Sequence, residues 1–118
     1  MSSRILYAAL TVALVAALAL EMAVTDTSWW LVVVFLLGPD VALLLGIGSG
    51  LEKGQLHPRA VPLYNALHRS AGPVVLLVLA SAGVLALPWF ILGLGWATHI
   101  AMDRAAGYRL RDRDGWIR

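Results

Sequence analysis

Four ionisable side chains interrupt stretches of this chain that are otherwise apolar over the length of a membrane span. They are Asp40, His68, His99 and Asp103. A charged side chain near the centre of a bilayer costs at least about 2.5–3.5 kcal/mol. We therefore expect the four groups to lie together inside the protein, where each can offset the cost of burying the others.

The overall composition indicates an integral membrane protein. Of the 118 residues, 60% are hydrophobic and 14% are charged, against about 45–50% and 25% in ordinary soluble domains. A chain of this length has room for one domain and cannot hide so much apolar surface from water. The sequence contains no cysteine, which excludes disulfides, thiolate chemistry and iron–sulfur clusters. The net charge of +2 gives no indication of a nucleic-acid partner.

Four apolar segments have about the length of a membrane-spanning helix, which needs roughly 20 residues. We expect helices over residues 5–24, 29–50, 61–87 and 88–110. The predicted fold is all-α: an integral membrane four-helix bundle, with a single four-pass domain over residues 1–118. Gly38-Pro39 predicts a kink in the second helix, because proline removes a backbone donor and disfavours the helical conformation of the residue before it.

The basic residues predict the orientation of this bundle. All nine fall on one side of a four-pass arrangement, and the connections at 25–28 and 86–88 contain none. The positive-inside rule then places both termini in the cytoplasm of a cell whose inner (plasma) membrane holds the protein. Trp29, Trp30 and Trp89 would form the aromatic belt at the opposite interface. The basic side, including the tail at 109–118, would rest on anionic lipid head groups.

The first apolar segment has an alternative interpretation as a cleaved signal peptide. Arg4 would supply its basic region, and small residues near Ala19 would supply the cleavage site. The apolar run is nevertheless longer than the 7–15 residues usual in a signal core. This length favours a retained helix.

Spacing along the chain predicts that the four ionisable groups share one level of the bundle. Asp40 lies 11 residues after Trp29, and His99 lies 11 residues after Pro88. At about 1.5 Å per residue, both are about 16 Å from the same interface. Asp103 is one helical turn beyond His99 on the same face. His68 is near the start of the third segment, in a similar zone, so the four can converge between the midplane and the inner leaflet.

Two histidines and two aspartates form a donor set that suits a divalent metal such as zinc, manganese or iron. The metal would keep both carboxylates ionised and would activate water against a membrane-associated substrate, as in metal-dependent hydrolases. Side chains expected to support the ligands or orient a substrate are Tyr64, Asn65, Trp96 and Arg104.

The alternative is a non-catalytic scaffold or transporter-like subunit whose buried polar residues specify helix packing. The sequence leaves open whether the protein is an enzyme. Gly46 and Gly50 have a spacing found in helix self-association, which suggests a homo-oligomer.

Three motifs resemble a known bacterial membrane family. They are Gly38-Pro39-Asp40, Tyr64-Asn65-Ala66-Leu67-His68, and the stretch 96–104 followed by Gly107-Tyr108. Over about residues 29–110 they are similar to the family called domain of unknown function 4260, which implies no particular activity.

A looser resemblance links the chain to predicted membrane-bound metal-dependent hydrolases. It rests on Pro39-Asp40, His68-Arg69 and the pair His99 and Asp103. The resemblance implies that these residues ligate a metal. The further Thr-His that usually follows the His-Arg of those hydrolases is absent here, where Ser70-Ala71-Gly72 stands.

Overall fold

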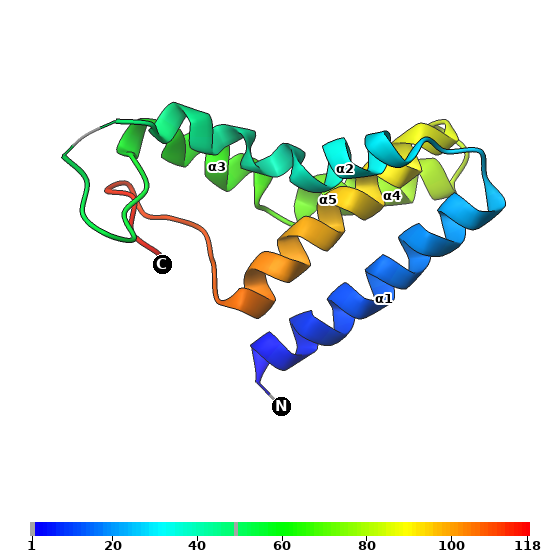
Figure 1. Ribbon diagram of the computed structural model, residues 1–118, viewed down its shortest axis with the longest axis horizontal. Helices are drawn as coiled ribbons and strands as arrows, with labels where there is room; N and C mark the ends of the chain where they lie inside the picture. The colour runs from blue at the N-terminus through cyan, green and yellow to red at the C-terminus, as the bar shows by residue number, and fades with distance from the viewer. Residues whose placement is uncertain (1, 49) are drawn as a thin grey trace.

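The chain folds into helices connected by short loops, as seen in the computed structural model, which describes residues 2–48 and 50–118 (Figure 1). The elements in chain order are α1 (Ser3–Val24), α2 (Trp29–Leu37), the 3-10 helix η1 (Gly38–Gly46), the 3-10 helix η2 (Pro58–Ala60), α3 (Val61–Leu67), α4 (Ala71–Ser81) and α5 (Leu87–Ala106). They form four helical segments, since η1 continues α2 and since η2, α3 and α4 make up the third. The all-α prediction is confirmed.

Three of these segments are long and apolar enough to cross a membrane: Ser3–Val24, Trp29–Gly46 and Pro58–Ser81. Along α1, Leu18 is buried, whereas large side chains such as Val12 and Leu20 are exposed. An apolar helix that exposes most of its surface requires an apolar solvent. The three segments therefore support membrane association. The fourth expected span corresponds to α5, which is 20 residues long and carries His99, Asp103 and Arg104.

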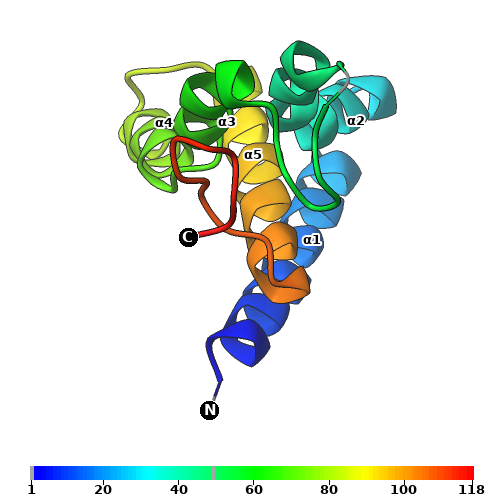
Figure 2. The same cartoon turned by 90° about the vertical axis from the view of Figure 1, so that its left-hand side faces the viewer.

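Helix α5 lies at the centre of the molecule and packs against α1, α2 and α4 (Figures 1 and 2). Ile91 and Leu94 on α5 form a core cluster with Leu18 of α1. Two glycines let the neighbours come close. A Cβ on Gly93 would lie 3.0 Å from the Leu77 side chain, and one on Gly95 would lie 3.2 Å from the Phe35 backbone. These small residues bring α4 and α2 against α5, and the contact at Gly95 lies one turn before His99.

The second segment changes helix type at Gly38, where the kink was predicted. Gly38 has helical angles, φ −53° and ψ −41°. A following proline disfavours that conformation when the residue has a Cβ, so glycine suits this position. Beyond it the chain is a 3-10 helix that ends at Gly46, because Ile47 is already extended. The predicted helix to residue 50 is therefore too long, although position 49 lies outside the described residues.

The third segment is broken, contrary to the single helix predicted over 61–87. Instead of one helix over 61–87, α3 ends at Leu67, α4 begins at Ala71, and α4 ends at Ser81. Pro73 explains the break, since it has no N–H to donate and its ring clashes with the carbonyl four residues earlier. The break leaves His68 at the C-terminal end of α3, with φ −106° and ψ 10°. The site histidine thus occupies a helix end.

Helix α5 ends four residues before the predicted position 110. Gly107 adopts a left-handed conformation with φ 101°, and the Tyr108 N–H donates to the Asp103 carbonyl at 2.8 Å. This glycine-based cap is a frequent helix stop. After it the tail turns back toward the loop at 50–57, where the Leu56 N–H donates to the Gly115 carbonyl at 2.9 Å. The tail is therefore folded against the protein, while its contact with lipid head groups stays a prediction.

Helices α1 and α5 have their ends close together on both sides of the molecule. Arg4 Nε donates to the Ala105 carbonyl at 2.8 Å, so the start of α1 meets the end of α5. At the other end, residues 25–28 line a cavity together with Leu87 and Pro88 at the start of α5. The connections without basic residues thus lie at one end of the α1–α5 pair, away from Arg4.

Candidate metal centre

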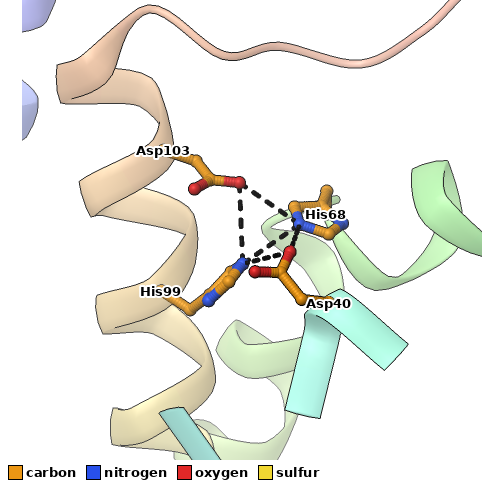
Figure 3. Close-up of side chains that lie close together, drawn as sticks. All are labelled: Asp40, His68, His99 and Asp103. Atoms are coloured by element: carbon orange, nitrogen blue, oxygen red, sulfur yellow. Dashed lines mark hydrogen bonds and ion pairs between the residues drawn. The ribbon is translucent and has the colours of Figure 1, made fainter. Parts of the chain in front are cut away.

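The four ionisable side chains predicted to converge lie together in the structure (Figure 3). Asp40 comes from the first turn of η1, and His68 from the end of α3. His99 and Asp103 lie one turn apart on α5. One ligand atom from each of the four residues lies within 4.8 Å of all the others. Three helical segments therefore contribute to one cluster.

The atoms that face one another are both histidine Nε2 atoms and one carboxylate oxygen from each aspartate. The two Nε2 atoms are 3.1 Å apart. His68 Nε2 is 3.2 Å from Asp103 Oδ2 and 3.5 Å from Asp40 Oδ1. His99 Nε2 is 3.2 Å from Asp40 Oδ1 and 3.5 Å from Asp103 Oδ2. Four ligands at about 2.0–2.2 Å around a tetrahedral ion lie about 3.3–3.6 Å apart. The four nitrogen–oxygen distances, at 3.2–3.5 Å, are close to these values, and the two nitrogens lie slightly closer together.

Backbone carbonyls hold both imidazole rings in place from the outside. His68 Nδ1 lies 2.8 Å from the Tyr64 carbonyl oxygen, and His99 Nδ1 lies 2.8 Å from the Leu36 carbonyl oxygen. A carbonyl only accepts, so Nδ1 of each ring carries a proton and donates it. In the neutral rings Nε2 then has a free lone pair. Metal-binding histidines usually have such a second hydrogen bond.

The kink explains why the Leu36 carbonyl is free to accept this bond. Leu36 is in the last turn of α2, where carbonyls lose their donors within the helix. Pro39, at the start of the 3-10 helix that follows, has no N–H to offer in their place. The proline therefore has two effects: it places Asp40 in the cluster and leaves an acceptor for His99.

The break after α3 frees further carbonyls, which side chains of α5 satisfy. Trp96 Nε1 donates to the Leu67 carbonyl at 2.6 Å, and Arg104 Nη2 donates to the His68 carbonyl at 2.8 Å. The Trp96 ring also covers Gly72, where a Cβ would overlap it. Trp96 and Arg104 thus fix the chain on either side of His68, without direct contact with the ligand atoms.

The other two residues expected near the site have different roles. The Tyr64 ring stacks on the His68 ring, with centroids 4.0 Å apart and planes at 16°. Asn65 is turned toward the tail: its Nδ2 donates to the Arg111 carbonyl, and its Oδ1 accepts from the Arg111 N–H, both at 2.8 Å. Asn65 therefore holds the tail beside α3.

The cluster is buried on its histidine side and open on its carboxylate side. The His68 side chain is 0% exposed, whereas the Asp40 side chain is 42% exposed. A cavity of about 280 Å³ adjoins the carboxylates and is lined by Asp40, Leu43, Tyr64, Asp103, Tyr108 and Arg111. A ligand from outside could thus reach the cluster between the two aspartates.

Arg111 is a charged residue of this cavity that, like Leu43 and Tyr108, was not predicted from the sequence. It is 8% exposed and its guanidinium carbon lies 5.7 Å from the centre of the Tyr64 ring. In the sequence it stands in a tail that alternates arginine and aspartate, and its pattern does not distinguish it from Arg109 or Arg113. Contacts with Asn65 and with the Gly54 carbonyl, both distant along the chain, place it here.

Two imidazoles and two carboxylates at these distances could hold a divalent metal. The carboxylates would offset the charge of the ion, and the buried rings would exclude water from one side. The edge between the carboxylates faces the cavity.

Comparisons with known proteins identify the family. No match was found among curated proteins or among solved structures. The family model described as "Domain of unknown function (DUF4260)" matches residues 4–117, which is nearly the whole chain. The motifs at 38–40, 64–68 and 96–104, which carried the resemblance, contain all four residues of the cluster. The chain therefore belongs to the DUF4260 family.

Proposed function

We propose that this protein is a multi-pass membrane protein that binds one divalent metal ion through Asp40, His68, His99 and Asp103. We further propose that it hydrolyses a membrane-associated substrate at that ion. The observation that carries the proposal is the convergence of two Nε2 atoms, 3.1 Å apart, and two carboxylate oxygens, each 3.2–3.5 Å from both Nε2 atoms.

Electrostatics favours a cation at the centre of this cluster. Because both Nδ1 atoms donate to carbonyls, two neutral rings direct their Nε2 lone pairs at each other over 3.1 Å. Two carboxylate oxygens add negative charge at the same point. Protons on both Nε2 atoms could be donated to the carboxylates at 3.2 Å, but they would leave two positively charged rings with Nε2 atoms 3.1 Å apart. A divalent ion satisfies all four atoms and neutralises both carboxylates.

The openness of the carboxylate side supports catalysis rather than a purely structural metal. Structural zinc sites are closed by four ligands, whereas catalytic sites keep a position for water. Here the edge between Asp40 and Asp103 borders the cavity, so a fifth ligand would approach from there. A metal in this position would lower the pKa of its bound water and supply hydroxide as the nucleophile. Zinc, manganese and iron all suit the donor set.

The residues around the ligands would preorganise this chemistry. The carbonyl bonds to His68 and His99 orient the rings, and the stacked Tyr64 ring restricts rotation of His68. Trp96 and Arg104 hold the interrupted backbone on which His68 is carried. Such support typically contributes 10–100-fold to metal affinity or activity.

Hydrolysis by purified protein in lipid nanodiscs tests the enzymatic part of the proposal. Zinc-, manganese- and iron-loaded protein would be offered chromogenic carboxylic and phosphoric esters, with and without a chelator. We expect turnover that is lost with chelator and in Asp103→Asn, but kept in Asp26→Asn, whose side chain lies in the distant 25–28 turn. Fully metal-loaded protein without hydrolysis of any ester would favour the scaffold, and equal turnover by Asp103→Asn would exclude this site.

We also propose that all four helical segments cross the inner membrane, with both termini in the cytoplasm. Three apolar segments and the placement of basic residues support this topology. Because the chain has no cysteine, single cysteines at Thr27 and Asp114 would report it directly. A membrane-impermeant maleimide added to intact cells should label the first and spare the second. The reverse pattern, or equal labelling, would contradict the topology.

A further inference from the structure

Arg111 is a buried cation beside the metal cluster, and it lacks an ion-pair partner. Within the described chain, the ion pairs at 4 Å or less are those of the Asp/His cluster, and none includes this guanidinium. Its Nη1 donates to the Gly54 and Gly115 carbonyls, at 2.7 and 3.2 Å. Its Nε is buried and has no hydrogen-bond partner. A buried charge with only neutral partners is costly, so an anion is the expected complement.

The same guanidinium lines the cavity that adjoins Asp40 and Asp103. With a divalent ion in the cluster, the two carboxylates are neutralised, and Arg111 leaves the cavity with a net positive charge. Without the ion, the carboxylates outweigh the arginine. The cavity therefore attracts anions only when the metal is present.

We propose that this cavity binds the phosphate group of the substrate, between the metal and Arg111. This inference rests on the proposed metal site and narrows its substrate to phosphate esters. Arginine N–H groups form strong, charge-assisted hydrogen bonds to phosphate, and the metal ion would bind another phosphate oxygen on the other side. Tyr64 and Tyr108, which also line the cavity, would lie on either side of the phosphate.

Binding of inorganic phosphate to zinc-loaded protein, followed by calorimetry in detergent, tests the proposal. We expect binding that weakens at least about tenfold in Arg111→Gln, since a hydrogen bond to a charged group is lost. Arg109→Gln and Arg113→Gln are matched controls, because both side chains are exposed in the same tail. Arg111→Lys keeps the charge but not the guanidinium donors, so it should give an intermediate affinity. It replaces Arg111→Gln in the test if that variant does not fold.

Zinc content is measured on every sample, so that the two proposals fail separately. If the wild type takes up no zinc, manganese or iron, the metal site itself is wrong. If zinc binds but phosphate does not, or if Arg111→Gln binds phosphate as tightly as Arg109→Gln, only the phosphate inference is wrong. Equal phosphate binding after chelation would also overturn it, as would acetate binding as tightly as phosphate.

Two further samples distinguish a free phosphate from a lipid head group. Phosphatidic acid in mixed micelles and inorganic phosphate are each measured for binding to the zinc-loaded protein. Each is then tested for its ability to displace the other. If the lipid binds more tightly than inorganic phosphate, and Arg111→Gln weakens the binding of both to the same extent, a lipid phosphate is the ligand. Equal binding of the two identifies the phosphate group alone as the recognised element, and competition by neither overturns the inference.

Discussion

Replacing Asp103 with asparagine should remove most of the stabilisation that a metal ion gives this protein. Asp103 Oδ2 lies 3.2 Å from His68 Nε2 and 3.5 Å from His99 Nε2, so it supplies one of four converging ligand atoms. Structural zinc sites contribute about 10–16 kcal/mol in total, or roughly 3 kcal/mol per ligand in a four-ligand site. The substitution should therefore weaken metal binding on the order of 100-fold.

The effect on thermal stability follows from mass action. With zinc at 100 times the wild-type dissociation constant, binding stabilises the folded state by about 2.7 kcal/mol. At the same zinc concentration, a 100-fold weaker site contributes only about 0.4 kcal/mol. For a chain of this size, about 1 kcal/mol shifts the melting temperature by roughly 4 °C. The zinc-induced shift should thus fall from about 10 °C in the wild type to about 2 °C in Asp103→Asn.

Circular dichroism in detergent, with chelator and with zinc, measures both shifts. The metal-free variant should melt no lower than the metal-free wild type, because the substitution removes a carboxylate from a cluster that already holds Asp40. Asp26→Asn, in the exposed turn at 25–28, should keep the full zinc-induced shift. An equal shift in Asp103→Asn and the wild type would refute the assignment of Asp103 as a ligand.

Three further predictions test the support of the site. Trp96→Phe leaves a backbone carbonyl without its donor and should destabilise the protein by about 1–2 kcal/mol in chemical unfolding, whereas Trp89→Phe, at an exposed position, should change stability by less than about 0.5 kcal/mol. Gly95→Ala forces α2 away from α5 and loosens the Leu36 carbonyl that orients the His99 ring. Zinc affinity, measured by competition with a fluorescent chelator, should therefore fall about tenfold. An unchanged affinity would mean that this helix contact does not control the ring. Asn65→Ala removes both hydrogen bonds to the backbone of Arg111, so the tail should be cleaved faster by trypsin after this change, and an unchanged rate would show that other contacts hold it.

The convergence of the four side chains could be predicted because it follows from counting residues. Asp40 and His99 are equally far from the apolar ends of their segments, and His99 and Asp103 are one turn apart on one helix. A low-dielectric environment penalises each group alone. Depth and electrostatics together indicated that the four groups can converge, and the packing of the helices brings them together.

The break in the third segment could not be located in the same way. Pro73 was visible in the sequence, but a proline in an apolar segment is compatible with a kinked continuous helix. The chain instead separates into α3 and α4 because Trp96 and Arg104, on α5, satisfy the carbonyls that the break exposes. Trp96 and Arg104 are distant from the break along the chain and come close to it only in the folded protein.

Arg111 escaped prediction for a related reason. The tail alternates charges, a pattern typical of solvated segments, and its individual arginines differ only in their tertiary contacts. The hydrogen bonds between Asn65 and the Arg111 backbone, over 46 positions in the chain, bury one arginine and leave its neighbours exposed. Local sequence carries no signal for such a contact.

Elemental analysis of the purified protein tests the central claim most directly. Wild-type protein isolated without chelators should contain close to one zinc, manganese or iron per chain, and the His99→Ala, Asp103→Ala double variant should contain none. The double variant His57→Ala, Asp26→Ala removes one histidine and one aspartate outside the cluster and should keep the full metal content. A wild-type protein that holds no metal, and takes none up when it is supplied, would contradict the account.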